Sequence, residues 1–396
     1  EKDFYESNTF YAQGGIIGPG TNDSPELLEK DIMRAGSGIN CKEAVHLLAG
    51  RGPAVVEEYL LDKVGVPFFR NTKGELDLTK EGAHSVRRIL HYRDESGKAI
   101  ELALLEYVKG LSRVSMKKKC MAIDVITNTH HSTDYQQRYK KTKSLGAYIY
   151  DEEEQQVYPI FAGAVVLSTG GCGNLFYHTS NPVGAVGDGI AMAYRAGASI
   201  INSEYIQFHP TILFHRDVKR FLISESVRGE GARLMNRNGE YFMERYNPEM
   251  RDLAPRDEVA RAIYREIENE ANGFVLLDTT KMELPLQERF PDIYETCKSI
   301  GIDIQNEPIP VVPAAHYFCG GIKVDLSGES SIDSLYAVGE SACTGVHGAN
   351  RLASVSLLEG LFFGIETGKA IARKGDSNPD TLYGSIPEWV YPIHEE

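Results

Sequence analysis

Hydrophobic residues recur at helical spacing early in the chain, over residues 27–35 and again over 45–64. Apolar side chains three and four positions apart lie on one face of an α-helix, so this pattern predicts two or three amphipathic helices. Gly36 and Gly50 stand within these stretches, and we expect both glycines to interrupt the helices.

The pattern becomes strand-like in the middle of the chain. Apolar and β-branched residues alternate or run continuously, between polar turns, over residues 121–126, 147–150, 157–161 and 164–167. We expect four strands, the last of them buried. Helical spacing returns over residues 190–196, 255–269 and 356–373. The chain is therefore predicted to be α/β, with an inserted α+β region from about residue 201 to residue 318.

Composition and charge narrow the class of protein. The 396 residues are 42% hydrophobic and 25% charged, which is enough for two or three globular domains. A net charge of -14 argues against a nucleic-acid or anionic-membrane partner. The six cysteines show neither a CxxC pair nor zinc-type spacing, so we expect reduced thiols and no metal. Without a long apolar run or a secretory start, a cytoplasmic protein is expected.

Glycine turns and charged residues gather around two short strands. Ser-Thr-Gly-Gly at 168–171 follows one predicted strand, and the apolar run 335–339 ends in Glu340. His347 and Arg351 come soon after, and a Gly-Asp-Gly sequence at 187–189 opens a predicted helix. Such a layout suits a nucleotide at the carboxyl ends of strands with an anionic substrate beside it.

These segments, together with the sequences at 7–15, 207–211 and 316–325, resemble the flavoprotein family of succinate dehydrogenase, fumarate reductase and L-aspartate oxidase. The resemblance implies a doubly wound, glutathione-reductase-like FAD-binding domain over 1–200 and 319–375. An α+β capping domain would span 201–318, and 376–396 would be a linker. The family's first βαβ unit and its C-terminal helical domain are expected to lie outside this chain.

The resemblance also implies a set of FAD contacts. Asn8 stands where covalent members of the family carry a histidine, so non-covalent FAD is expected. The helix that begins near Ser356 would direct its N-terminal amides at the flavin. The cofactor-binding residues implied in this way are Lys2, Asn8, Thr9, Phe10, Tyr11, Ala12, Gln13, Gly14, Gly15, Thr169, Gly170, Asp188, Glu340, Ser356 and Leu357.

A substrate site for a dicarboxylate is implied by the same resemblance. The matching carboxylate ligands are His209, Ser224, His316 and Arg351. Arg256 matches the arginine that transfers a proton in fumarate reduction, and Glu225 with Arg228 would form a relay toward it. An alternative for Arg256 is a plain helix-start salt bridge to Asp257 or Glu258.

Glu81 bears on the choice of substrate. It matches the residue that aspartate oxidases place near the substrate's α-amino group, and a carboxylate there would favour aspartate over succinate. The alternative is a surface glutamate paired with Lys80. The chain departs from the aspartate oxidase pattern at Ala83, Ile206 and Val355 without losing a proposed catalytic group.

The implied activity is FAD-dependent oxidation of L-aspartate to iminoaspartate, with O2 or fumarate as electron acceptor. This would be the first step of NAD biosynthesis through quinolinate, and quinolinate synthase would be a partner. Two alternatives remain: a soluble fumarate reductase or succinate dehydrogenase flavoprotein, and a non-catalytic remnant of the fold.

Overall fold

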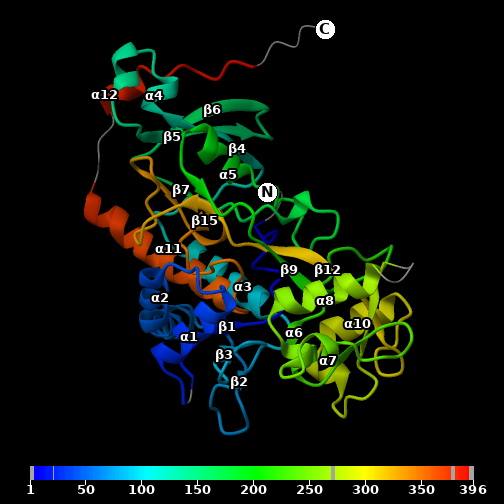
Figure 1. The fold of residues 1–396 in the computed structure, drawn as a ribbon. Coiled ribbons are helices and arrows are strands. Elements are labelled where there is room, and N and C mark those ends of the chain that lie inside the picture. Colours follow the sequence, from blue (N-terminus) through cyan, green and yellow to red (C-terminus); the bar gives the residue numbers. More distant parts are fainter. Residues whose placement is uncertain (1–3, 21, 269–272, 376–379, 392–396) are drawn as a thin grey trace, which may run out of the picture.

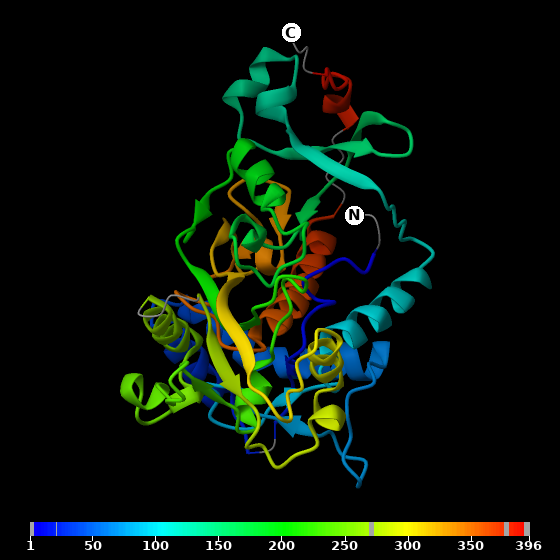
Figure 2. The same cartoon turned by 90° about the vertical axis from the view of Figure 1, so that its right-hand side faces the viewer.

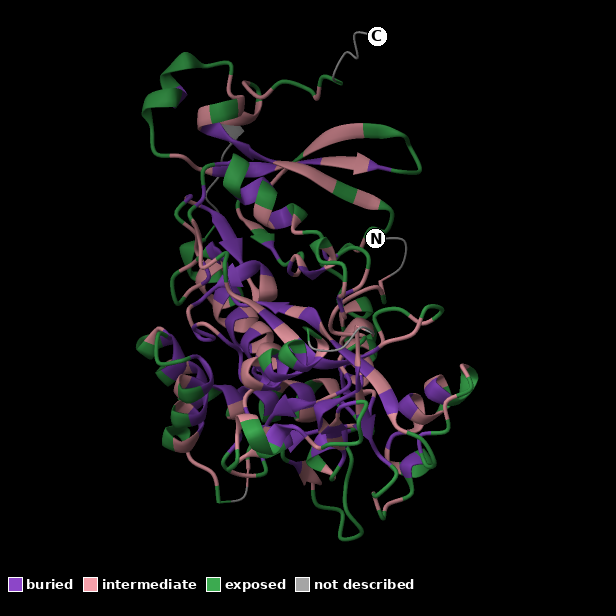
Figure 3. Cartoon of the chain, turned by 45° about the vertical axis from the view of Figure 1, so that its right-hand side comes forward, coloured by how far each residue is buried: buried purple, intermediate pink, exposed green. Residues whose placement is uncertain are grey.

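The computed structural model describes residues 4–20, 22–268, 273–375 and 380–391. Figure 1 shows three parts: helices at lower left, a mixed body at lower right and a small sheet at the top. Buried residues fill the first two parts, whereas much of the upper sheet is half-buried or exposed (Figure 3). The separate hydrophobic clusters of the described residues follow the same division.

The part at lower left, which we call the base, is built on the predicted amphipathic helices. Its helices are α1 (Pro25–Ala35), α2 (Lys42–Val55), the π-helix η1 (Val56–Val64), α3 (Ser96–Lys109) and α11 (Val355–Lys374). Its sheet consists of β1 (Ile16–Ile17), β3 (Ile89–Leu90) and β2 (Leu78–Thr79). Ser24 caps α1 by accepting a hydrogen bond from the Leu27 amide. Helix α3 has no counterpart among the predicted elements.

The expectation for the two glycines is half right. Gly36 ends α1, but Gly50 lies exposed inside α2, which runs unbroken through it. Helix α2 continues because its buried stripe packs on α11, and at Gly52 a side chain would come within 3.0 Å of Leu358. The packing outweighs the roughly 1 kcal/mol that a glycine costs within a helix.

The upper sheet contains three of the four predicted strands. They are β4 (Cys120–Thr127), β5 (Ser144–Asp151) and β6 (Gln156–Phe161), paired antiparallel, with α4 (Asn128–His131) and η2 (Tyr135–Tyr139) between β4 and β5. The C-terminal segment, with α12 (Asp380–Tyr383), packs on this sheet. Trp389, the chain's single tryptophan, lies 5.2 Å from the ring of Tyr148.

Short strands connect the upper sheet with the base. Strand β7 (Val165–Leu167) pairs in parallel with β14 (Leu335–Ala337), and β13 (Gly321–Lys323) lies between β15 (Ala342–Cys343) and β8 (Ile200–Ile201). Helix α5 (Asp188–Arg195) packs beside them, and the short turns η3 (Gly173–Leu175) and η5 (Gly339–Ser341) follow β7 and β14. The prediction that the whole fourth strand is buried is wrong, because only one face of β7 meets the core and Val166 is 42% exposed.

The elements from β9 to β12 form the cap, which has its own hydrophobic core. Its antiparallel sheet has the order β10-β11-β12-β9, and β9 and β12 run side by side in Figure 2. The elements are β9 (Ile206–Leu213), α6 (Glu225–Gly229), β10 (Arg233–Met235), α7 (Met243–Tyr246), η4 (Arg251–Leu253), α8 (Arg256–Glu268), β11 (Val275–Asp278), α9 (Leu286–Arg289), α10 (Pro291–Ser299) and β12 (Ile309–Phe318).

Cap and base meet where the loop after β3 reaches α10. The Asp94 carboxylate accepts hydrogen bonds from the amides of Asp292 (3.0 Å) and Ile293 (3.3 Å). Asp94, which belongs to the base, thus satisfies two amides in the first turn of helix α10 of the cap. None of the described helices combines the length and apolar content needed to cross a bilayer.

Candidate active site

The predicted catalytic and substrate residues come from both sides of the base–cap junction. Strands β9 and β12 carry His209 and His316, and Ser224 and Arg256 stand at the start of α6 and α8. Arg351 precedes α11 in the base. The fold therefore brings together side chains that are far apart in the sequence.

Arg256 is buried and faces two acceptors. Its Nε donates to Glu225 Oε2 at 2.6 Å, and its Nη1 donates to Gln207 Oε1 at 3.2 Å. The alternative of a local salt bridge is not what the structure shows. Asp257 instead pairs with Arg261, and Glu258 accepts from Asn247.

Glu225 lies between two arginines, as the relay hypothesis requires. Arg228 Nη2 is 3.9 Å from the same Glu225 Oε2 that accepts from Arg256. Burial alone would raise the pKa of Glu225, but the positive charges of Arg256 and Arg228 outweigh it and lower that pKa to about 2. Glu225 is therefore an ionised hydrogen-bond acceptor at neutral pH.

Gln207 joins the two central arginines. Arg351 donates to Gln207 Oε1 through Nε (3.3 Å) and Nη2 (3.1 Å), and the same oxygen accepts from Arg256. The Gln207 amide nitrogen in turn donates to Asn350 Oδ1 at 2.6 Å. Sequence reasoning missed this residue, although its spacing of two from His209 along β9 places both on one face of the strand.

Two neutral histidines adjoin the arginines. The rings of His209 and His316 are 5.0 Å apart, and burial, followed by the neighbouring positive charges, holds both pKa values well below the ordinary range. His209 Nδ1 accepts the Thr211 amide, so the proton of the neutral ring is on Nε2. That N–H has no partner among the described residues, and it is suited to a substrate carboxylate.

Glu81 is a buried residue of this site, which contradicts its interpretation as a surface residue. It is 4% exposed and accepts a hydrogen bond from Ser354 Oγ, whereas Lys80 donates to the Ser85 carbonyl. Burial and then the charge of Glu225 raise the pKa of Glu81, and Arg256 and Arg351 oppose this. The carboxylate is therefore close enough to the arginines to interact with their charges.

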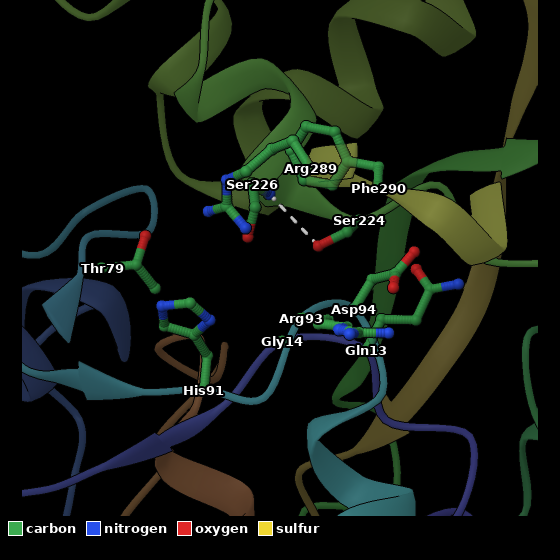
Figure 4. A pocket seen from close by; sticks show the side chains of 10 residues that line it. All are labelled: Gln13, Gly14, Thr79, His91, Arg93, Asp94, Ser224, Ser226, Arg289 and Phe290. Atoms are coloured by element: carbon green, nitrogen blue, oxygen red, sulfur yellow. Dashed lines mark hydrogen bonds between the residues drawn. The ribbon is translucent and has the colours of Figure 1, made fainter. Parts of the chain in front are cut away.

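A small pocket opens at the edge of these residues, between base and cap. Figure 4 shows Gln13 and Gly14 on the base side and Ser224, Ser226 and Arg289 on the cap side. The Ser224 hydroxyl accepts from the Ser226 amide at 3.3 Å. Because Ser224 is one of the predicted carboxylate ligands, the pocket adjoins the proposed substrate position.

Several predicted flavin contacts lie around Glu340. Its Oε2 accepts from Asn8 Nδ2 at 2.7 Å and its Oε1 from the Phe318 amide at 2.9 Å. Burial raises the pKa of Glu340 to about 7. Ser356 lies in the first turn of α11 and accepts from Arg351 at 2.5 Å, which links the predicted flavin contacts to the substrate residues.

Glycines let the main chain pass closely at this place. A side chain at Gly15 would come within 2.1 Å of the Leu90 carbonyl, and one at Gly171 within 2.3 Å of Glu340. Gly170 has a φ of +76°, which favours glycine. The close approaches at Gly15 and Gly171 are to other parts of the protein itself. The buried Gln13 Oε1, which has no hydrogen-bond partner among the described residues, is suited to a hydrogen-bonding cofactor such as FAD.

Other predicted flavin contacts are placed less tightly. Tyr11, Thr169 and Asp188 are exposed, and Asp188 accepts from its own helix at the Gly189 amide. Lys2 lies outside the described residues. Among the remaining predicted contacts, the side chains of Thr9, Phe10, Ala12 and Leu357 are half-buried.

Comparison with known proteins shows the family of this chain. A family model described as "FAD binding domain" matches residues 1–357. The L-aspartate oxidase of Acinetobacter baylyi is 43% identical over 97% of this chain and 69% of its own length, and that of Halobacterium salinarum is 45% identical over 93% and 68%.

Solved structures give the same fold. An E. coli quinol fumarate reductase matches with a TM-score of 0.85 and 29% identity over 96% of this chain and 66% of that one. A second quinol-fumarate reductase structure, with menaquinol molecules, has the same TM-score, and the match covers 68% of the reductase chain. The chain thus spans about two thirds of the length of these relatives.

Proposed function

This chain belongs to the L-aspartate oxidases, within the FAD-binding flavoproteins, and from that premise we propose that its site converts L-aspartate to iminoaspartate. The observation that carries the proposal is the pair of arginines joined by Gln207, with the buried carboxylate of Glu81 beside them. Asn8 and Glu340 would be among the residues that hold FAD, which would supply a hydride acceptor for the substrate Cα–H and a source of electrons for an acceptor such as fumarate.

The cationic and neutral donors of the site would hold the two substrate carboxylates. Arg351 offers a guanidinium fork, the neutral His209 ring offers its free Nε2–H, and Ser224 and His316 complete the ligand set. Fixing both carboxylates orients the Cα–H bond, and orientation supplies much of an enzymatic rate. Glu81 would face the ammonium group of aspartate.

Arg256 would act on protons rather than on binding alone. Its contact with the ionised Glu225, which Arg228 also approaches, provides a buried path of charged groups from the site into the cap. In the direction of fumarate reduction, Arg256 would donate the proton that the product carbon needs, and this path would reload it.

A substitution at Arg256 tests this role. We expect Arg256→Leu to lower kcat by about 10²–10⁴-fold, the usual contribution of general acid–base catalysis, while FAD stays bound. Stopped-flow turnover and the flavin absorbance measure the two properties. Arg261→Leu on the same helix is the matched control, because that side chain is 61% exposed. Turnover retained in Arg256→Leu would remove Arg256 from the proton step.

The substrate is tested by anaerobic reduction of the FAD-loaded enzyme. We expect L-aspartate to bleach the flavin absorbance and succinate to leave it unchanged. Bleaching by succinate alone would place the enzyme with the succinate dehydrogenases. A protein that neither holds FAD nor bleaches would be the non-catalytic remnant.

Finer points of this proposal rest on the family alone. We propose O2 as a second electron acceptor, quinolinate synthase as the consumer of iminoaspartate, and the cytoplasm as the location. Steady-state oxygen consumption with and without fumarate tests the choice of acceptor.

A further inference from the structure

Ser354 directs its side chain to Glu81 across the molecule. The hydroxyl donates to Glu81 Oε2 at 2.5 Å, although the two residues are 273 positions apart in the sequence. Both residues are buried, with exposures of 7% and 4%. None of the roles described above uses Ser354.

Ser354 does not cap the helix that it precedes. Ser354 precedes α11, where a serine usually accepts a hydrogen bond from the first helical turn, yet within the described chain its side chain makes no such cap. Ser24, at the same position before α1, does make one. The Ser354 hydroxyl, which at this position could accept a hydrogen bond from its helix, instead donates one to Glu81.

The backbone of Ser354 is also unfavourable for its residue type. Its φ of 60° and ψ of 2° lie in the left-handed region, which costs a non-glycine residue roughly 1–2 kcal/mol. Strain of this kind persists where the surrounding structure holds a residue for another purpose. Here that conformation accompanies the contact to Glu81.

Gly14 bounds the other oxygen of the same carboxylate. A side chain at Gly14 would come within 2.6 Å of Glu81 Oε1, so the absence of a Cβ leaves room for this oxygen. Glu81 is therefore held through Oε2 by the Ser354 hydroxyl, and its Oε1 occupies space that a side chain at residue 14 would take.

The charges around Glu81 make the hydrogen bond consequential. Glu225 repels a negative charge at Glu81, and Arg256 and Arg351 attract it. A hydroxyl donor favours the ionised carboxylate over the neutral acid, and only the ionised form attracts an ammonium group. The Ser354 hydroxyl thus acts on both the orientation and the charge of Glu81, where it opposes the larger effect of burial.

We propose that Ser354 is a positioning residue that holds Glu81 oriented and ionised, so that the site prefers a dicarboxylate with an α-ammonium group over one without it. This inference rests on the proposed role of Glu81 in aspartate oxidation. It deepens that role by assigning substrate selection to a pair of residues rather than to a lone glutamate.

The test compares two substrates in three variants. Ser354→Ala removes the hydroxyl, Ser354→Gly removes it and relieves the backbone strain, and Glu81→Gln removes the charge. For each we would measure kcat/KM for L-aspartate oxidation and for fumarate reduction across pH, together with FAD content and the thermal midpoint. Ser24→Ala is the control for the loss of a helix-preceding serine far from Glu81.

Both Ser354 variants should lower kcat/KM for aspartate about tenfold or more, mainly through KM, as expected for a lost hydrogen bond to a charged group. Fumarate reduction should stay within about twofold. Without the hydroxyl, the pKa of Glu81 rises further, so the acid limb of the aspartate profile should move to higher pH. Ser354→Gly should keep or raise the thermal midpoint and show the same loss of selectivity.

The outcomes distinguish a failure of the role proposed for Ser354 from a failure of the role proposed for Glu81. If Glu81→Gln changes the ratio of aspartate to fumarate activity and both Ser354 variants leave it unchanged, Ser354 has no positioning role. If Glu81→Gln also leaves the ratio unchanged, the amino-group role of Glu81 fails, and the role of Ser354 fails with it. A parallel loss of both activities with FAD content would make Ser354 merely structural.

Discussion

At the scale of single residues, the site combines neighbours that sequence motifs suggest with one that they do not. Arg256, Glu225 and Arg351 were predicted from the resemblance of short motifs to the flavoprotein family, and they lie within hydrogen-bonding reach of common partners. Gln207 was not predicted, because a neutral amide carries no chemical signature of its own. Its importance follows from being the shared acceptor of two buried guanidinium groups, which only the fold brings together.

Glu340 should make stability depend on pH. Burial raises its pKa from 4.5 to about 7, so between these values the folded state binds more protons than the unfolded state. Its contribution to stability is therefore largest below about pH 4.5 and is lost as the pH rises through 7. We therefore expect the thermal midpoint of Glu340→Gln, measured on FAD-stripped protein, to increase relative to that of the parent as the pH rises from about 4.5 to above 7.

Thermal melts of the two proteins at a series of pH values measure the difference. Parallel profiles would mean that the Glu340 carboxyl titrates in the folded protein much as it does in the unfolded chain. Glu359, the carboxylate whose charge acts on Glu340, is present in both proteins.

At the scale of elements, local patterns predicted helices and hairpin strands well and distant pairings poorly. The helices at α1, α2, α5, α8 and α11 and the meander of β4 to β6 were expected from spacing alone. The cap sheet pairs Val311 with Leu213 and Val275 with Val311, across long loops. Such register depends on tertiary packing, which a periodicity of two does not encode.

The contact between Asp94 and α10 should stabilise the cap against the base. We expect Asp94→Ala to cost about 1–2 kcal/mol, the usual loss for a helix cap, because the amides of Asp292 and Ile293 lose their acceptor. Hydrogen exchange should rise in α10 and stay unchanged in α1 and α2.

Asp134→Ala is the control for that measurement, because Asp134 caps a short turn in the upper part of the molecule. Equal exchange in α10 of the Asp94 variant and the parent would show that the cap holds its position without this carboxylate.

At the scale of the whole molecule, the sequence allowed the class of fold to be predicted but not the meeting of its parts. An α/β chain with an inserted α+β region follows from the order of helical and strand-like patterns, and the solved relatives share that fold. The site, however, draws residues from the loop at Glu81, two strands and three helix starts. No local pattern states that these segments converge on one junction.

Trp389 gives the molecule a selective optical signal. It is the only indole in the chain, and it packs against Tyr148 at the far end from the cap core, which contains none. Its fluorescence will therefore follow the release of the C-terminal segment from the upper sheet. Unfolding of the cap alone should be silent in tryptophan emission, so a fluorescence melt and a circular dichroism melt of this protein need not coincide.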